Sequence, residues 1–281
     1  MSSRTIVTVD ELERRLGDPS WVIADCRHSL ADFSLGRQQY DESHIPGAFF
    51  VSVEDELAGT KTGRNGRHPL PEPQAFAAVL REFGVKPDTQ IVAYDAGADM
   101  FAARMWFLAK YIGHSAVAIL DGGFAAWRAA GKPVTTQIPK RPANGTILAE
   151  VRSDLTVDVH AVLQSLRERH LTLLDARAAD RFAGQNETVD PVAGHIPGAR
   201  HRHFKDNFDE RGLFKNPQQL RAEFERLQID PDRMVHQCGS GVSSAVNLLA
   251  MEIAGIGGSR IYPGSWSEWI ADPSRPIATG S

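Results

Sequence analysis

The sequence predicts an α/β protein built from two copies of one domain, each a mainly parallel sheet covered by helices on both faces. Two observations carry this prediction. Short motifs recur in the same order in the two halves of the 281-residue chain, as expected for a duplicated domain. In each half, short apolar segments alternate with amphipathic ones, which indicates alternating strands and helices. Such alternation favours a parallel sheet between helical layers.

The repeat sets the expected domain limits. A stretch rich in Pro, Gly, Asn and Thr separates the two copies, as is typical of a linker. We therefore expect an N-terminal domain over residues 1–132, a linker over 133–155 and a C-terminal domain over 156–281. The paired segments are 25–27 with 175–177, 44–48 with 195–199, 91–95 with 234–238, and Gly122 and Trp127 with Gly264 and Trp269.

The individual elements follow from the apolar pattern. Short apolar runs predict strands, and longer stretches with one apolar face predict helices. In chain order, the first copy gives strand 21–25, helix 73–83, strand 91–95, helix 100–111 and strand 116–120. The second gives strand 171–175, helix 217–227, strand 234–237, helix 242–254 and strand 260–262. Ligands of such sheets bind beyond the carboxyl ends of the strands, so we expect the site there.

Composition narrows the range of partners. Hydrophobic residues make up 42% of the chain and charged residues 23%, as in ordinary globular proteins. The net charge of -4 gives no overall attraction to nucleic acid or to an anionic membrane. The first residues lack the apolar core of a secretion signal, and no apolar run approaches the ~18 residues of a membrane span. We expect a cytoplasmic protein with a small-molecule or protein partner and no nucleic-acid or membrane partner.

Cys238 is the candidate nucleophile. It lies between an apolar strand and an apolar helix and is followed by Gly239, Ser240, Gly241, Val242 and Ser243. Glycines let successive N–H groups curl round one point, and the helix directs its positive end there, so a thiolate is stabilised and reactive. We expect the N–H groups of residues 239–243 to form an anion cradle. The hydroxyls of Ser240 and Ser243 either donate to the sulfur or cap the helix.

The other cysteine, Cys26, follows a strand but precedes no glycine loop, so we expect it to be a packing residue. The two cysteines lie far apart without framework spacing, which predicts no structural disulfide. Cys238 is then free to react.

The chain resembles the two-domain rhodanese sulfurtransferases over nearly its whole length. The resemblance rests on the repeated His-Ile-Pro-Gly-Ala turn, the loop that begins at Cys238, and the closing segment 264–269. It implies tandem rhodanese-like domains of which only the C-terminal one carries the nucleophile, and Asp95 stands where Cys238 stands in the other copy. It also implies that Cys238 takes sulfur from a donor as a persulfide and passes it to a thiophilic acceptor. Cyanide, a small thiol or a thioredoxin-like protein can accept this sulfur, and no cofactor is expected.

Within that family, the chain most resembles the 3-mercaptopyruvate sulfurtransferases. Thiosulfate-preferring members often carry cationic side chains directly after the cysteine, whereas Gly239 and Ser240 follow it here. The resemblance identifies Arg181 as the arginine that binds the donor's carboxylate, which suits its planar guanidinium. The second arginine usual in these enzymes is replaced by Asp190.

Other basic residues have two interpretations each. Arg200 and Arg202 could replace the missing arginine or could be solvated loop residues. The loop 61–68 could line a cleft and steer an anion, or could be a plain surface turn. Arg177 is expected in a structural ion pair, because its Asp-x-Arg spacing recurs at Arg27 in the copy without a nucleophile.

The spacing of three histidines could suggest a metal site. We expect none there, because Arg200 and Arg202 flank them and would oppose a cation. The histidines are His195, His201 and His203.

Several alternative functions use the same loop or one like it. A thiosulfate sulfurtransferase would use the same cysteine. A non-catalytic rhodanese-like scaffold is disfavoured by the intact loop, but a persulfide carrier that serves a protein partner stays open. A cysteine phosphatase needs an arginine that closes the loop, and the residue at that position is Ser244.

Overall fold

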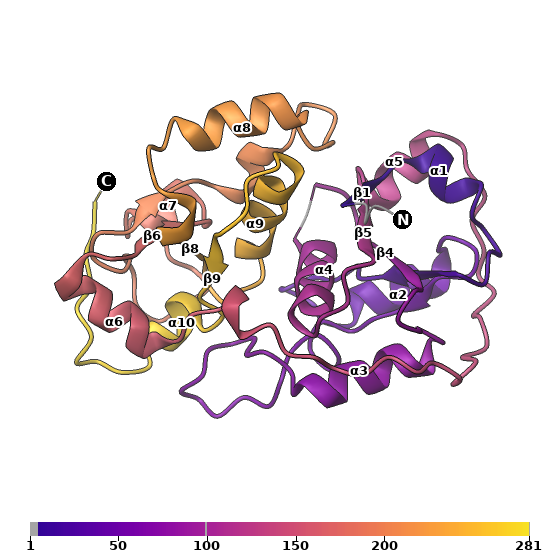
Figure 1. The fold of residues 1–281 in the computed structure, drawn as a ribbon, viewed down its shortest axis with the longest axis horizontal. Helices are drawn as coiled ribbons and strands as arrows, with labels where there is room; N and C mark the ends of the chain where they lie inside the picture. The colour runs from indigo at the N-terminus through magenta and orange to yellow at the C-terminus, as the bar shows by residue number, and fades with distance from the viewer. Residues whose placement is uncertain (1–4, 99, 281) are drawn as a thin grey trace. The chain divides into compact units, whose positions relative to one another are not determined.

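The computed structural model describes residues 5–98 and 100–280, which form two compact units (Figure 1). Unit 1 consists of the described residues of Met1–Gly59, Leu70–Arg152 and Phe208–Phe214. Unit 2 consists of the described residues of Thr60–Pro69, Ser153–Asn207 and Lys215–Ser281. The segment 60–69 thus belongs to the second unit although most of unit 1 follows it in the sequence. The domain boundaries expected from the sequence stay a prediction.

Unit 1 contains a parallel sheet in the order β1-β5-β4-β2-β3. Its strands are β1 (Ile6–Val7), β2 (Trp21–Asp25), β3 (Phe49–Phe50), β4 (Gln90–Tyr94) and β5 (Val117–Leu120). Its helices are α1 (Val9–Glu13), α2 (Leu35–Glu42), α3 (Pro73–Glu82), α4 (Phe101–Tyr111) and α5 (Gly123–Ala129). Side chains of α1 and α5 pack with β4 and β5 in one core, and α4 contacts β4 and β5 separately, so helices cover both faces.

Unit 2 repeats this plan with a parallel sheet in the order β7-β6-β8-β9. Its strands are β6 (Thr172–Asp175), β7 (Arg200–His201), β8 (Met234–Gln237) and β9 (Arg260–Ile261). Its α-helices are α6 (Val159–Glu168), α7 (Ala179–Phe182), α8 (Pro217–Glu225), α9 (Ser244–Ile253) and α10 (Ser265–Trp269). Short 3-10 helices are η1 (Ser153–Leu155), η2 (Phe204–Asn207) and η3 (Pro231–Arg233).

Helices cover both faces of the second sheet as well. Figure 1 shows α6 and α10 on one side of β6, β8 and β9, and α8 with α9 on the other. The core on the α6 side contains Val162, Val235, Trp266 and Trp269, all buried. On the other side α9 contacts β8 and β9, and α8 packs against α9. The two parallel sheets with helices on both faces confirm the predicted fold class.

Every strand and helix expected from the sequence is present, with ends that differ by at most two residues. The sequence missed the two-residue strands β1, β3 and β7, which are too short to show a periodic pattern. It also did not predict the helices α1, α2, α5, α6, α7 and α10. No helix in the described ranges combines the length and apolar character needed to cross a membrane.

The repeated Asp-x-Arg motif forms the same buried ion pair in each unit. The Asp25 and Arg27 side chains approach to 2.6 Å, and those of Asp175 and Arg177 to 2.7 Å. In both pairs the carboxylate also accepts the backbone N–H of the arginine. The predicted structural role of Arg177 is therefore confirmed.

Candidate active site

Cys238 follows β8 directly and lies at the carboxyl edge of the sheet in unit 2, where ligands of such sheets bind. Only 2% of the residue is exposed. Its backbone is held on both sides: its N–H donates to Oγ of Ser265 at 3.1 Å, and its carbonyl accepts the N–H of Trp266 at 3.0 Å. These bonds fix the position of the sulfur.

Residues 239–243 curl round this sulfur. Gly241 makes the curl possible, because its φ of 77° lies in the left-handed region and a Cβ there would lie 2.2 Å from the carbonyl oxygen of Pro263. The N–H of Gly241 donates to Sγ of Cys238 at 3.1 Å. Since the loop continues through residue 243, α9 begins at Ser244, two residues later than the sequence predicted.

The set of N–H donors also differs from the one expected. The sulfur accepts bonds from the backbone N–H groups of Ser240, Gly241 and Ser244. Gly239 contributes its carbonyl to a bond from the N–H of Ser267 at 2.9 Å. Within the described residues, the cradle therefore lies nearer to α9 than predicted and includes the first residue of that helix.

The loop serines do not cap α9. Ser243 occupies the N-cap position without a side-chain capping bond, and its hydroxyl donates to the Cys238 sulfur. Oγ of Ser240 lies 2.8 Å from Nδ1 of His68, which is buried. The Ser243 hydroxyl thus lowers the pKa of Cys238, and the Ser240 hydroxyl contacts the segment 60–69.

These contacts control the acidity of the thiol. Burial by itself raises the pKa of Cys238, because it disfavours the charged form. Hydrogen bonds from the Ser243 hydroxyl and from the backbone N–H groups of Ser240 and Ser244 act in the opposite direction, and the pKa lies below the ordinary value of a thiol. The site therefore favours a thiolate, which is the reactive form of cysteine.

Ser265, which bonds the backbone of Cys238, has an unusual backbone conformation. Its φ is 55°, a left-handed value that favours glycine, and the matching residue of unit 1 is Gly123 with a φ of 56°. The Ser265 hydroxyl accepts the Cys238 N–H and donates to the carbonyl of Tyr262 at 2.9 Å. Strain of this kind persists where the surroundings fix it, as is common next to functional groups.

Unit 1 holds a carboxylate where unit 2 holds the sulfur. Asp95 follows β4 as Cys238 follows β8, and its two oxygens accept the N–H groups of Gly97 at 3.0 Å and Ala102 at 2.9 Å. Burial raises the pKa of Asp95, and these bonds act in the opposite direction. The first copy of the loop thus binds an anion of the protein itself.

Cys26 has none of the features that activate Cys238. It is fully buried, and burial followed by the nearby charges of Asp25, Asp95 and Glu56 raises its pKa well above that of an ordinary thiol. Its environment fits the predicted packing role.

Two arginines lie beside the loop. Nη2 of Arg181 lies 2.8 Å from the Glu187 carboxylate and 3.0 Å from the Asp190 carboxylate. Arg67 forms an ion pair with the other oxygen of Asp190. The charge of Cys238 also affects Arg67: burial lowers the pKa of the Arg67 guanidinium, and the charge of Cys238 raises it.

The charged groups converge on Gly239, the residue after Cys238. A Cβ placed on Gly239 would lie 2.9 Å from Nη2 of Arg67, 3.6 Å from Nη2 of Arg181 and 3.7 Å from Oδ2 of Asp190. A side chain at this position would displace the guanidinium of Arg67. The absence of a side chain at residue 239 is therefore what lets the cations approach the cysteine.

The second cation of the site is Arg67. From the sequence alone, its loop fits one that steers an anion and a plain surface turn equally well. Arg200 donates to the carbonyl of Leu227, and Arg202 pairs with Glu223, so neither takes the place of the missing arginine. Arg67 and His68 lie about 170 residues before Cys238 in the chain, and only the basic residues of their loop pointed to an anion site, whereas its Gly and Asn content equally fitted a surface turn. Glu187 gave no signal.

The three histidines considered for a metal site have other contacts, and the ring of His203 packs edge-on against that of Phe204 with 4.9 Å between the centroids. Nδ1 of His195 lies 2.8 Å from the Phe182 carbonyl, and Nε2 of His201 lies 2.8 Å from the Arg177 carbonyl. Within residues 5–98 and 100–280, no group of three His, Cys, Asp or Glu side chains is arranged to bind a metal ion.

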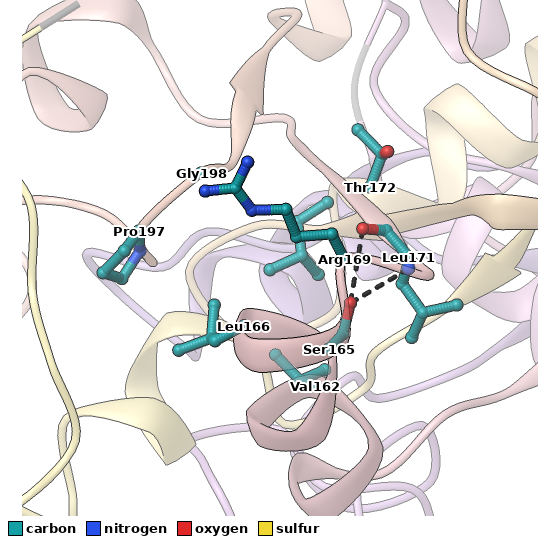
Figure 2. Close-up of a pocket in the computed structure, with 9 residues that line it drawn as sticks. Val162, Ser165, Leu166, Arg169, Leu171, Thr172, Pro197 and Gly198 are labelled. Carbon is teal, nitrogen blue, oxygen red and sulfur yellow. Dashed lines mark hydrogen bonds between the residues drawn. The ribbon is translucent and has the colours of Figure 1, made fainter.

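A pocket of about 440 Å³ in unit 2 lies away from the site (Figure 2). Thr172 lines it at the start of β6, and this residue pairs with Met234 at the start of β8. Cys238 follows the other end of β8. In Figure 2 the Ser165 hydroxyl bonds both backbone groups of Leu171, so this polar group of the pocket is already satisfied.

We predict that Ser243→Ala raises the pKa of Cys238, because it removes a hydroxyl that stabilises the thiolate. The rate of alkylation by iodoacetamide rises with pH as the thiolate forms, so the midpoint of this rise should move upward by about one pH unit. Ser240→Ala is the matched control, since Ser240 reaches the sulfur through a backbone N–H that alanine keeps. Equal midpoints for wild type and Ser243→Ala would contradict the hydrogen-bond explanation.

Comparison with known proteins agrees with this geometry. The family model described as a rhodanese-like domain matches residues 8–130 and 158–272. A Pseudomonas aeruginosa protein named "Probable 3-mercaptopyruvate sulfurtransferase" is 45% identical over 285 residues that cover 100% of both chains. The thiosulfate sulfurtransferase of Mus musculus is 32% identical over 95% of this chain and 91% of its own.

Solved structures give the same result. The crystal structure of SseA from Escherichia coli, a 3-mercaptopyruvate sulfotransferase, superimposes with a TM-score of 0.81 at 31% identity, over 94% of this chain and 99% of that one. The 3-mercaptopyruvate sulfurtransferase from Leishmania major gives a TM-score of 0.84 at 27% identity, over 96% of this chain and 75% of that one. The chain therefore belongs to the rhodanese family, as a sulfurtransferase with two rhodanese-like domains.

Proposed function

We propose that this protein transfers sulfur from 3-mercaptopyruvate to a thiophilic acceptor through a persulfide on Cys238. The observation that carries the proposal is the buried Cys238 sulfur, whose thiol pKa is lowered by surrounding hydrogen bonds, beside the guanidinium groups of Arg181 and Arg67. A stabilised sulfur anion next to two cations suits a donor that carries a reactive sulfur and a carboxylate.

In the first half of the reaction, the Cys238 thiolate attacks the sulfur of 3-mercaptopyruvate. A sulfur–sulfur bond forms and the carbon–sulfur bond of the donor breaks. Its electron pair leaves with carbon as the enolate of pyruvate, which takes up a proton. Arg181, with Arg67 beside it, binds the carboxylate through charge-assisted hydrogen bonds.

In the second half, an acceptor such as cyanide or a thiol attacks the outer sulfur of the persulfide, and the Cys238 thiolate is released. The persulfide is an anion like the thiolate. The same N–H groups of Ser240, Gly241 and Ser244 therefore stabilise both forms. The loop acts by stabilising negative charge on sulfur, and its N–H groups are in place before the donor binds.

The donor assignment rests on the neutral start of the loop. Gly239 has no side chain and the Ser240 hydroxyl contacts His68, so the cations come only from Arg67 and Arg181 among the described residues beside Gly239. A donor with a single carboxylate matches this small number of guanidinium groups. The relative from Pseudomonas aeruginosa is named for the same donor.

Thiosulfate is the second candidate donor. The relative from Mus musculus is named a thiosulfate sulfurtransferase, and a guanidinium can bind a sulfonate oxygen as well as a carboxylate.

We propose a thioredoxin-like protein as one possible macromolecular acceptor, with cytoplasmic location and no nucleic-acid or membrane partner.

The comparison of the two donors tests the proposal. We expect kcat/KM for sulfur transfer to cyanide to be higher with 3-mercaptopyruvate than with thiosulfate. Cys238→Ser should lose transfer from both, while Cys26→Ser, the matched control in unit 1, keeps it. A higher kcat/KM with thiosulfate would favour the second candidate. Unchanged transfer by Cys238→Ser would remove this cysteine from the reaction.

A second test concerns the donor-binding arginines. Arg181→Lys keeps the charge but loses the planar fork, so the KM for 3-mercaptopyruvate should rise about tenfold. Arg67→Lys should act in the same direction. Arg200→Lys makes the same chemical change at a residue that contacts Leu227 and should leave KM unchanged. Equal KM values for Arg181→Lys and Arg200→Lys would show that Arg181 does not bind the donor.

A further inference from the structure

Asp190 is a carboxylate inside the cluster of cations beside the nucleophile. Its side chain is 1% exposed, and both of its oxygens are used: one pairs with Arg67, and the other lies 3.0 Å from Nη2 of Arg181. Its backbone N–H donates to the Glu187 carboxylate at 2.9 Å, which fixes its place in the chain. Asp190 thus binds the same two guanidinium groups that the proposed function assigns to the donor.

The charges of this cluster balance before any donor arrives. The guanidinium groups of Arg67, Arg177 and Arg181 face the carboxylates of Asp175, Glu187 and Asp190. The Cys238 thiolate adds one further negative charge. Without Asp190, the cluster and the thiolate together would be neutral, so this one carboxylate decides whether an arriving anion meets net repulsion.

We propose that Asp190 determines donor specificity by selecting against donors with two negative charges. A fixed carboxylate repels a dianion about twice as strongly as a monoanion at the same place, because Coulomb energy is proportional to charge. Thiosulfate is a dianion and 3-mercaptopyruvate carries one carboxylate. The inference rests on the proposed function, since it assigns both donors to the cations beside Cys238.

A monoanion can be accommodated without removing Asp190. The bonds that the structure gives Arg181 use Nε and Nη2, so within the described residues Nη1 is left for a ligand. The Arg181 side chain is 21% exposed, which gives solvent access to the guanidinium. A single carboxylate can therefore bind at Nη1 while Asp190 keeps its own bonds.

Asp190→Asn tests the inference, because it removes the charge and keeps the size of the side chain. The ratio of kcat/KM for thiosulfate to kcat/KM for 3-mercaptopyruvate should rise on the order of tenfold. Asp190→Glu keeps the charge and should keep the wild-type ratio. Asp180→Asn is the matched control: Asp180 adjoins Arg181 in the chain, but its carboxylate accepts bonds from the Arg181 backbone and from Asn186.

Inhibition by anions that hold no transferable sulfur separates this inference from the proposed function. Sulfate, a dianion, should inhibit the wild type more weakly than pyruvate, and Asp190→Asn should reverse that order. This comparison needs no assumption about which donor is preferred. Its wild-type measurement remains informative even if the Asp190→Asn protein does not fold. An unchanged donor ratio in a folded Asp190→Asn protein, or sulfate inhibiting the wild type more strongly than pyruvate, would overturn the inference while leaving sulfur transfer through Cys238 in place.

Discussion

A negative charge has to be stable on the buried sulfur of Cys238. The loop after β8, the start of α9 and Ser265 are arranged around this requirement. Burial alone works against the charge, since only 2% of Cys238 is exposed. Hydrogen bonds from the Ser243 hydroxyl and from backbone N–H groups of the loop and of the start of α9 reverse the effect. That arrangement needs Gly241 in a left-handed conformation, a later start of α9, and Ser265 to hold the Cys238 backbone. The anion cradle thus explains the local strain.

The duplication shows how one fold element can serve structure in one copy and chemistry in the other. Both copies end a central strand in a turn whose N–H groups bind an anion. In unit 1 that anion is the Asp95 carboxylate, which is part of the chain. In unit 2 it is the Cys238 sulfur, which can react. The two turns therefore differ at one position: Asp95 fills the turn of unit 1 with its own carboxylate, and Cys238 makes the turn of unit 2 a candidate active site.

The sequence was most informative where the determinants are local. The repeats, the strand before Cys238 and the glycine loop after it are contiguous, so the fold class and the strand-to-helix turn that carries Cys238 could be predicted from pattern alone. Arg67 and His68 could not, because only the folded chain brings the segment 60–69 to the loop after β8. Asp190 was noticed as a departure from the family, but its contacts with two arginines depend on the tertiary structure.

The most direct test of the central claim is to locate the transferred sulfur. The protein is treated with 3-mercaptopyruvate without an acceptor, and its cysteine peptides are then analysed by mass spectrometry. We expect one added sulfur atom on the peptide that contains Cys238, none on the peptide that contains Cys26, and loss of the added sulfur after treatment with cyanide. Sulfur on neither peptide, or on Cys26 instead, would contradict a reaction that proceeds through the stabilised Cys238 anion.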